Sequence, residues 1–260
     1  MPGEIPIQSR KRSLGVKKYE LISFDTPQAL AESAAGDWLD CIKAAHEGGH
    51  SHCVALSGGR IARPFFAASV EKAKGQKIPL NHVHFFWADE RCVPPQDPES
   101  NFALAQECLF RPLQIPTRQV HRIRGEIDPQ NAAKEAEAEI WRIVSLPAAG
   151  QPMLDLIILG MGEDGHVASL FPEMQKEQLA LNGVCQALTA SPKPPPHRVT
   201  LSYATIAAAG EVWVLVSGAG KAAALGDSLT PGGKTPLGRV LEMRESTRIY
   251  CDLPLGSHTP

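Results

Sequence analysis

The chain has 260 residues, enough for one α/β domain with a sizeable core, and its formal net charge is only −2. Such a balance gives no overall attraction to nucleic acid or anionic membranes, so we expect neither as a partner. The six scattered cysteines form no CxxC pair, and no apolar run reaches the roughly 20 residues that span a bilayer. We therefore expect a cytoplasmic protein with reduced thiols, a monomer or weak dimer, folded as a single domain over 1–260 with a flexible segment at 1–15.

Apolar runs of strand length alternate with alanine-rich segments of helical spacing along the chain. This alternation predicts βαβ units and an α/β fold: an open, mostly parallel, doubly wound sheet with helices on both faces. The expected strands are Tyr19–Phe24, Cys53–Ser57, Val83–Ala88, Leu154–Gly160, Val199–Tyr203, Val212–Ser217 and Arg248–Asp252. The expected helices are Pro27–Glu47, Ile61–Lys74, Ser100–Phe110, Pro129–Val144, Lys221–Leu229 and Pro236–Glu242, with Ser100 and Asp128 as N-caps. Both termini, Leu146–Pro152 and the proline-rich Ser191–His197 are expected to be the least ordered stretches.

The first informative turn is Ser57-Gly58-Gly59-Arg60, between an expected strand and an expected helix. Paired glycines let backbone N–H groups approach an anion, and a helix N-terminus adds positive potential, so the turn suits a phosphate. The alternative is a strand-to-helix turn that binds no ligand. The positive charge of Arg60 slightly favours a ligand. The next expected strand ends in Asp89-Glu90-Arg91, which suits either a binding site or a solvated loop.

A second turn follows the apolar run that starts at Asp155, in the stretch DLIILGMGEDGHVASLFP. Its glycines, Gly160 to Gly165, satisfy the GxGxxG pattern of dinucleotide-binding proteins. That interpretation is disfavoured because Glu163 and Asp164 would face a pyrophosphate, and neither a strand nor an acidic residue is expected about 20 residues further on. At the carboxyl end of a buried strand, Asp164 and His166 instead lie where a substrate binds, with a helix-like segment expected after them.

Further basic residues fall at other ends of the expected strands. Arg198 precedes one strand, and Lys221 follows another within Gly-Ala-Gly-Lys, so both suit a phosphate monoester, although each could be an ordinary surface cation. A Walker A loop is disfavoured, because Leu215 replaces its opening glycine and Ala222 its serine or threonine. The histidine-rich stretch His46–Cys53 matches no standard zinc spacing, so we expect no metal and no organic cofactor.

These segments together resemble the 6-phosphogluconolactonases. The matching segments, in order, are SGG at 57–59, WADERCVP at 87–94, SNFALA at 100–105, LGMGEDGHVASLFP at 159–172, RVTLS at 198–202 and the region of Lys221. The GMGxDGHxASLFP signature is highly specific, whereas the other segments are weak on their own. The related glucosamine-6-phosphate isomerases and deaminases share the DGH turn, but there it usually continues towards an AFNEP-like sequence.

The resemblance implies hydrolysis of 6-phospho-D-glucono-1,5-lactone to 6-phospho-D-gluconate, in the pentose phosphate pathway, without metal or organic cofactor. We expect His166 to take a proton from the attacking water and return it to the ring oxygen, with Asp164 orienting the imidazole or holding sugar hydroxyls. The residues expected to bind substrate or its phosphate are Ser57, Gly58, Gly59, Arg60, Asp89, Arg91, Asn101, Arg198 and Lys221.

One position departs from the pattern, since many bacterial members continue SGG with Ser-Thr-Pro, whereas this chain has Arg60-Ile61-Ala62. Arg60 either replaces the missing hydroxyls with a charged contact or points to solvent. Two other functions are open alternatives. A sugar-phosphate isomerase or deaminase would release ammonia from glucosamine 6-phosphate, and a non-catalytic sugar-phosphate regulator would have no need of His166 and usually brings a DNA-binding segment, of which no sign is visible.

Overall fold

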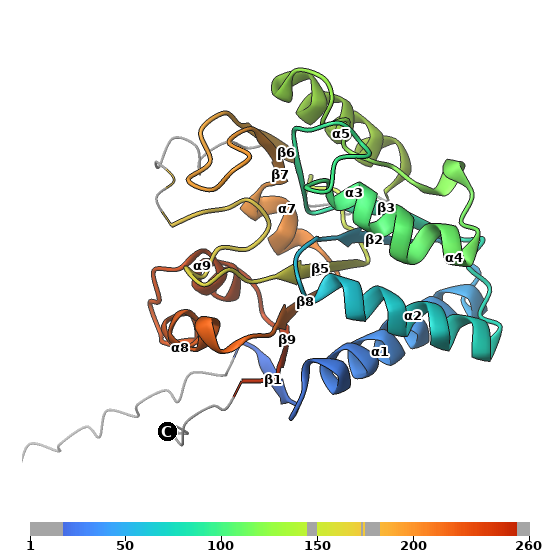
Figure 1. Ribbon diagram of the computed structural model, residues 1–260, viewed down its shortest axis with the longest axis horizontal. Coiled ribbons are helices and arrows are strands. Elements are labelled where there is room, and N and C mark those ends of the chain that lie inside the picture. Colours follow the sequence, from blue (N-terminus) through green and yellow to red (C-terminus); the bar gives the residue numbers. More distant parts are fainter. Residues whose placement is uncertain (1–17, 145–149, 173, 175–182, 254–260) are drawn as a thin grey trace, which may run out of the picture.

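The computed structural model describes residues 18–144, 150–172, 174 and 183–253, arranged around a six-stranded parallel sheet (Figure 1). In spatial order its strands are β1 (Glu20–Ser23), β9 (Arg248–Cys251), β8 (Glu211–Val216), β5 (Leu156–Gly160), β2 (His52–Leu56) and β3 (Val83–Trp87). The central strands β2 and β5 are buried on both faces, which explains their nearly continuous apolar sequences. The predicted parallel α/β sheet is confirmed.

The order of the strands brings the two glycine-rich turns together. From β2 the chain moves outwards to β3, whereas from β5 it moves the other way, through β8 to β9. Strands β2 and β5 are neighbours and parallel, so the turns that follow them emerge at the same edge of the sheet. In open α/β sheets ligands bind at such a switch point, outside the carboxyl ends of the strands.

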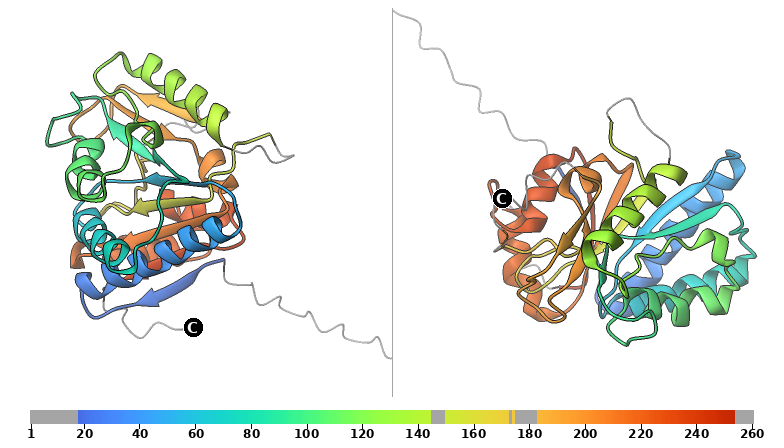
Figure 2. Two further views of the ribbon diagram at one scale, coloured as in Figure 1. Left: turned by 90° about the vertical axis from the view of Figure 1, so that its right-hand side faces the viewer. Right: turned by 90° about the horizontal axis from the view of Figure 1, so that it is seen from above.

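Helices lie on both sides of the parallel sheet (Figure 2). The two long helices α1 (Pro27–Glu47) and α2 (Ala62–Gln76) pack together on one side, where Trp38 meets Phe65 with ring centroids 5.6 Å apart. On the other side lie α7 (Tyr203–Ala208), α8 (Ala222–Leu229) and α9 (Pro236–Met243). No helix in the described residues is long and apolar enough to cross a membrane.

The remaining helices follow the predicted pattern closely. A π-helical turn, Gln106–Phe110, joins α3 (Asn101–Ala105) to α4 (Arg111–Leu113). Helix α5 spans Pro129–Ile143, and two 3-10 turns occupy Thr117–Gln119 and Ala219–Lys221. Both predicted N-caps are confirmed, since Ser100 accepts a hydrogen bond from the N–H of Ala103, and Asp128 from those of Gln130 and Asn131.

A second, antiparallel sheet contains β4 (Asp89–Arg91), β7 (Arg198–Leu201) and β6 (Cys185–Leu188), in that order, with α5 packed on β6 and β7. The expected strand Val199–Tyr203 corresponds to β7, which lies in this antiparallel sheet and not in the parallel one. Strand β7 is buried on both faces, so its apolar run looks like that of a parallel strand, and Ser202 then caps α7. The solvated-loop interpretation of residues 89–91 is wrong, because they pair with β7.

Three further predictions need correction or fall outside the described residues. A strand does follow the GxGxxG turn by about 20 residues, namely β6, but it is antiparallel and carries no acidic residue. The stretch after His166 is not helical as far as Phe171, because Ala168 adopts a left-handed φ of 49° and Val167 forms single bridges to Met161 and Leu170. Residues 1–15, most of Leu146–Pro152 and 254–260 lie outside the described residues.

Candidate active site

The turn after β2 has the geometry of an anion cradle. Gly59 has a left-handed φ of 96°, and a Cβ on Gly58 would overlap the side-chain oxygen of Asn101, so both positions require glycine. Within the described part of the chain, the backbone N–H groups of residues 58–60 donate to no protein group. They lie just before the first turn of α2, whose dipole favours an anion at this end.

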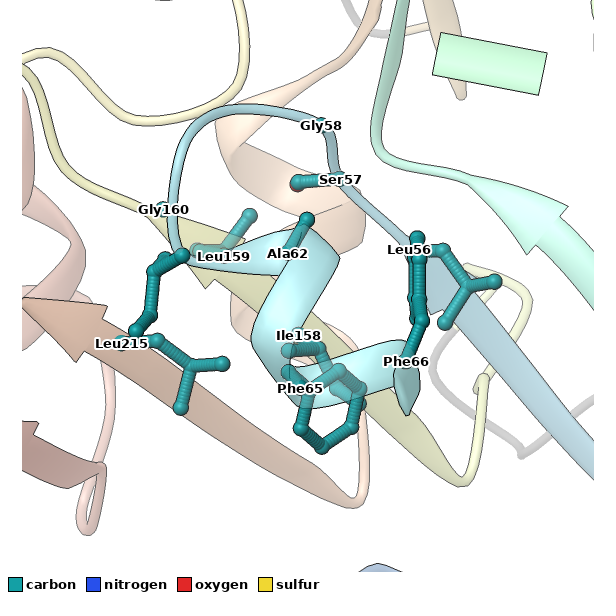
Figure 3. Close-up of a pocket in the computed structure, with 11 residues that line it drawn as sticks. Leu56, Ser57, Gly58, Ala62, Phe65, Phe66, Ile158, Leu159, Gly160 and Leu215 are labelled. Atoms are coloured by element: carbon teal, nitrogen blue, oxygen red, sulfur yellow. The ribbon is translucent and has the colours of Figure 1, made fainter. Parts of the chain in front are cut away.

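Apolar side chains pack between the turn after β2 and the ends of the neighbouring strands. Figure 3 shows the small cavity under the turn, where side chains from the first turns of α2, such as Phe65, meet those from the ends of β2, β5 and β8, such as Ile158 and Leu215. These side chains are almost fully buried. Ser57 begins the turn, and its buried hydroxyl has no hydrogen-bond partner among the described residues. A ligand oxygen at the turn would give this hydroxyl the partner that buried polar groups normally have.

The turn after β5 brings Asp164 and His166 into direct contact. The N–H of Gly162 donates to the carbonyl of His166 at 2.8 Å, and Gly165 has a left-handed φ of 79°. This folds the Asp164 side chain back, with its Oδ1 2.5 Å from Nδ1 of His166. Because a carboxylate only accepts, the proton lies on Nδ1, and Nε2 is the nitrogen available as a base.

Burial and neighbouring charges set the protonation of this pair. Burial lowers the pKa of His166, opposed by the hydrogen bond and charge of Asp164. Burial would raise the pKa of Asp164, but hydrogen bonds from Lys193 and His166 outweigh it and lower that pKa to about 2. At neutral pH the pair is therefore a carboxylate beside a neutral imidazole, the form that a general base requires.

Two cations, Lys221 and Arg60, border the cradle in different environments. Lys221 is only 8% exposed, and no hydrogen bond or ion pair engages its ammonium group in the residues that the structure describes. Burial, followed by the charge of Arg60, lowers the pKa of Lys221. Arg60 itself is exposed and lies 3.3 Å from Oε1 of Glu163, so it links the two glycine-rich turns across the mouth of the site. A lysine that is mostly buried but keeps a free ammonium group suits an anionic ligand.

Arg198 is buried and largely occupied by protein groups. Its Nε donates to the carbonyl of Pro195, its Nη2 to those of Lys193 and Pro194, and its Nη1 to the hydroxyl of Ser169. A guanidinium has five N–H groups, so one, on Nη1, is left over for a ligand. These bonds connect the segment Ser191–His197 to the buried Arg198.

The side chains after β3 form a rigid polar wall. Asp89 accepts hydrogen bonds from Ser169 at 2.7 Å and from the amide of Asn101 at 3.3 Å. Glu90 accepts from the backbone N–H groups of residues 91, 101 and 102, although burial still raises its pKa. Arg91 is held by the carbonyl of Glu99 at 2.7 Å. Asp89, Arg91 and Asn101 are thus fixed before a ligand arrives.

One pocket brings the predicted residues together. It is a small cavity of about 90 Å³ that opens to solvent. Every predicted site residue except Asp164 lines it: Ser57, Gly58, Gly59, Arg60, Asp89, Arg91, Asn101, His166, Arg198 and Lys221. Asp164 lies behind His166, on the Nδ1 side of the ring. We call this space the switch-point pocket.

Two residues near the site were not predicted as site residues. Ser169 connects Asp89 to Arg198, and Lys193 lies 2.8 Å from Oδ2 of Asp164. Ser169 lies within LGMGEDGHVASLFP, the most specific motif of the chain, so its position in the sequence could have identified it as a site residue. Lys193 stands in a proline-rich stretch that suggests only a loop, and its contact with Asp164 spans residues far apart in sequence.

The fold and the site together define an α/β protein whose parallel sheet presents an anion cradle and a histidine–carboxylate pair at one switch point. A family model described as glucosamine-6-phosphate isomerases/6-phosphogluconolactonase matches residues 25–249. The chain belongs to this family.

Individual relatives agree with that assignment. A protein of Aggregatibacter actinomycetemcomitans named 6-phosphogluconolactonase is 34% identical over 219 residues, covering 83% of this chain and 88% of its own. The crystal structure of a devB protein superposes with a TM-score of 0.82 at 30% identity, covering 93% of this chain and 100% of the other. The 6-phosphogluconolactonase of Trypanosoma brucei superposes with a TM-score of 0.77 at 27% identity, covering 89% and 95%.

Proposed function

We propose that the protein hydrolyses 6-phospho-D-glucono-1,5-lactone to 6-phospho-D-gluconate, as the names of its relatives indicate for them. The observation that carries this proposal is the switch-point pocket. It places a phosphate cradle with an unpartnered buried lysine, Lys221, beside a histidine, His166, whose Nε2 is free to act as a base. A substrate with a phosphate at one end and an ester carbonyl at the other suits both features.

The phosphate is held by the Gly58-Gly59 turn and by cations around it. The free N–H groups of residues 58–60 and the Ser57 hydroxyl donate to its oxygens, and Lys221 supplies a full charge within the pocket. Arg60 contributes from the rim when it leaves Glu163. Arg198 contributes the single N–H that its protein partners leave over.

Hydrolysis proceeds by attack of water on C1 of the lactone. Nε2 of His166 takes a proton from the water as its oxygen bonds to C1, and Asp164 stabilises the resulting imidazolium through Nδ1. The developing oxyanion at C1 requires a hydrogen-bond donor other than those that hold the phosphate. The C1–O5 bond then breaks and His166 returns its proton to O5. The new carboxylic acid loses a proton to the solvent, which makes the reaction measurable.

The sugar hydroxyls contact the wall of the pocket formed by Asp89, Asn101 and Arg91. Their side chains are pre-positioned by protein hydrogen bonds, so little conformational entropy is lost on binding. The six cysteines are free thiols, which supports the cytoplasm as the compartment. The family model covers residues 25–249 without a break, and this supports a single domain.

The proposal is tested by adding purified protein to freshly prepared lactone and comparing proton release with the spontaneous rate. We expect a large excess in the wild type and its loss, by about 100-fold or more, in His166→Gln. His50→Gln is the control, since this histidine lies at the opposite end of β2. Ammonia release from glucosamine 6-phosphate, measured in parallel, tests the isomerase or deaminase alternative. Equal proton release with and without the protein would overturn the proposed function.

A further inference from the structure

The carboxylate of Asp164 has two separate partners. Its Oδ1 lies 2.5 Å from Nδ1 of His166, while its Oδ2 lies 2.8 Å from Nζ of Lys193. The same Nζ is 3.3 Å from Nδ1 of His166. Three side chains from two distant segments therefore form one charged cluster on the side of the imidazole that faces away from the switch-point pocket.

Lys193 is held at this position by the backbone of its own segment. The buried guanidinium of Arg198, which is 3% exposed, donates to the carbonyls of Lys193, Pro194 and Pro195 at 3.3, 3.0 and 3.1 Å. Three hydrogen bonds from one planar guanidinium fix a loop far better than a single hydrogen bond. Arg198 thereby anchors the loop from which the Lys193 side chain reaches Asp164.

We propose that Lys193 is a positioning residue for the general base. By bonding Oδ2, it fixes the plane of the Asp164 carboxylate so that Oδ1 faces Nδ1 of His166, and its charge disfavours the imidazolium. It is not a catalytic residue, because it does not line the switch-point pocket and lies beside Nδ1, the nitrogen that does not face substrate. The kinetic part of this proposal rests on the proposed function, whereas the titration of His166 does not.

The charges around His166 give the direction of the expected effect. Burial lowers the pKa of His166, Asp164 and the more distant Asp89 raise it, and Lys193 lowers it. Asp164 stays ionised well below neutral pH, because its pKa is about 2. Removing the charge of Lys193 should therefore raise the pKa of His166, so that more of the base is protonated near neutral pH. A lower proton affinity in the wild type also helps the imidazolium to return its proton to O5.

The test compares Lys193→Met, which keeps much of the aliphatic stem, with Lys193→Arg, which keeps the charge. In Lys193→Met we expect the NMR titration midpoint of His166 to rise by about half a unit to one unit. The apparent pKa of the acid limb of the kcat/KM profile should rise by the same amount. In addition, kcat should fall several-fold with little change in KM. Lys193→Arg should bring the His166 midpoint and kcat most of the way back to their wild-type values. His166 is assigned by the signal missing in His166→Gln, and thermal unfolding checks that each variant is folded.

Lys134→Met is the matched control, because Lys134 is exposed on α5 and remote from the site. Its titration and kinetics should match those of the wild type. Lys193→Gln replaces Lys193→Met if that variant does not fold. A His166 midpoint unchanged in the charge-removing variant, or moved as far by Lys134→Met, would overturn the role of Lys193. Absence of lactonase activity in the wild type would overturn the proposed function and leave the titration test intact.

Discussion

Nδ1 of His166 and Oδ1 of Asp164 lie 2.5 Å apart, although only one residue separates them in sequence. Neighbouring side chains on a turn usually diverge, and here two glycines make the contact possible. Gly165 adopts a left-handed φ of 79°, and Gly162 has no side chain to occupy the space where the two groups meet. The contact determines which nitrogen carries the proton, and it leaves Nε2 as the base.

The pH dependence of the reaction should reflect the environment of His166. Because burial lowers its pKa, kcat/KM should be constant near neutral pH and fall only as the pH drops below the ordinary histidine value of about 6.5. Initial rates between about pH 5 and pH 8, corrected for spontaneous hydrolysis, give this profile. The phosphate of the substrate also titrates near pH 6, so the NMR titration of His166 separates the two groups. A midpoint above the ordinary histidine value in both measurements would contradict the expectation.

Lys221 should matter for binding and not for folding. Its side chain is mostly buried and its ammonium group has no hydrogen bond or ion pair within the described residues, so methionine removes a charge that burial disfavours. We expect Lys221→Met to raise KM by about 10-fold or more, while the free energy of unfolding stays the same or rises by about 1 kcal/mol. Inorganic phosphate should raise the melting temperature of the wild type and of Lys134→Met, but not that of Lys221→Met. Equal stabilisation of all three would place the phosphate elsewhere.

Arg60 should act on the substrate from the rim of the pocket. Its ion pair with Glu163 joins two exposed side chains, so Arg60→Ser should change the free energy of unfolding by no more than about 0.5 kcal/mol. If Arg60 turns from Glu163 to the phosphate, Arg60→Ser raises KM about three-fold to ten-fold with kcat unchanged. Glu163→Gln should then lower KM slightly, because it releases Arg60. Opposite shifts of KM in the two variants support this role, and an unchanged KM in both would show that Arg60 points to solvent.

Much of the site was predictable because its chemistry is local. Glycines after buried strands, such as Gly58 and Gly59, indicate that the backbone passes close to another group. Parallel strands bring such turns to the same edge of the sheet. The orientation of β7 was not predictable, since a short strand buried on both faces has the same apolar run in either kind of sheet. The contact between Lys193 and Asp164 was not predictable either, because it depends on how Arg198 holds a distant loop.

Gly162 provides the sharpest test of the contact between Asp164 and His166. A Cβ at this position would overlap Nδ1 of His166 and would lie 2.5 Å from Oδ1 of Asp164, so Gly162→Ala must push the two side chains apart. We expect kcat to fall by about 100-fold, with little change in KM, because the phosphate cradle belongs to another turn. Gly36→Ala is the matched control: Gly36 lies inside α1, a Cβ there meets nothing within 4 Å, and the helix should gain about 0.5–1 kcal/mol. Wild-type kcat in Gly162→Ala would show that the pair is not needed in this geometry.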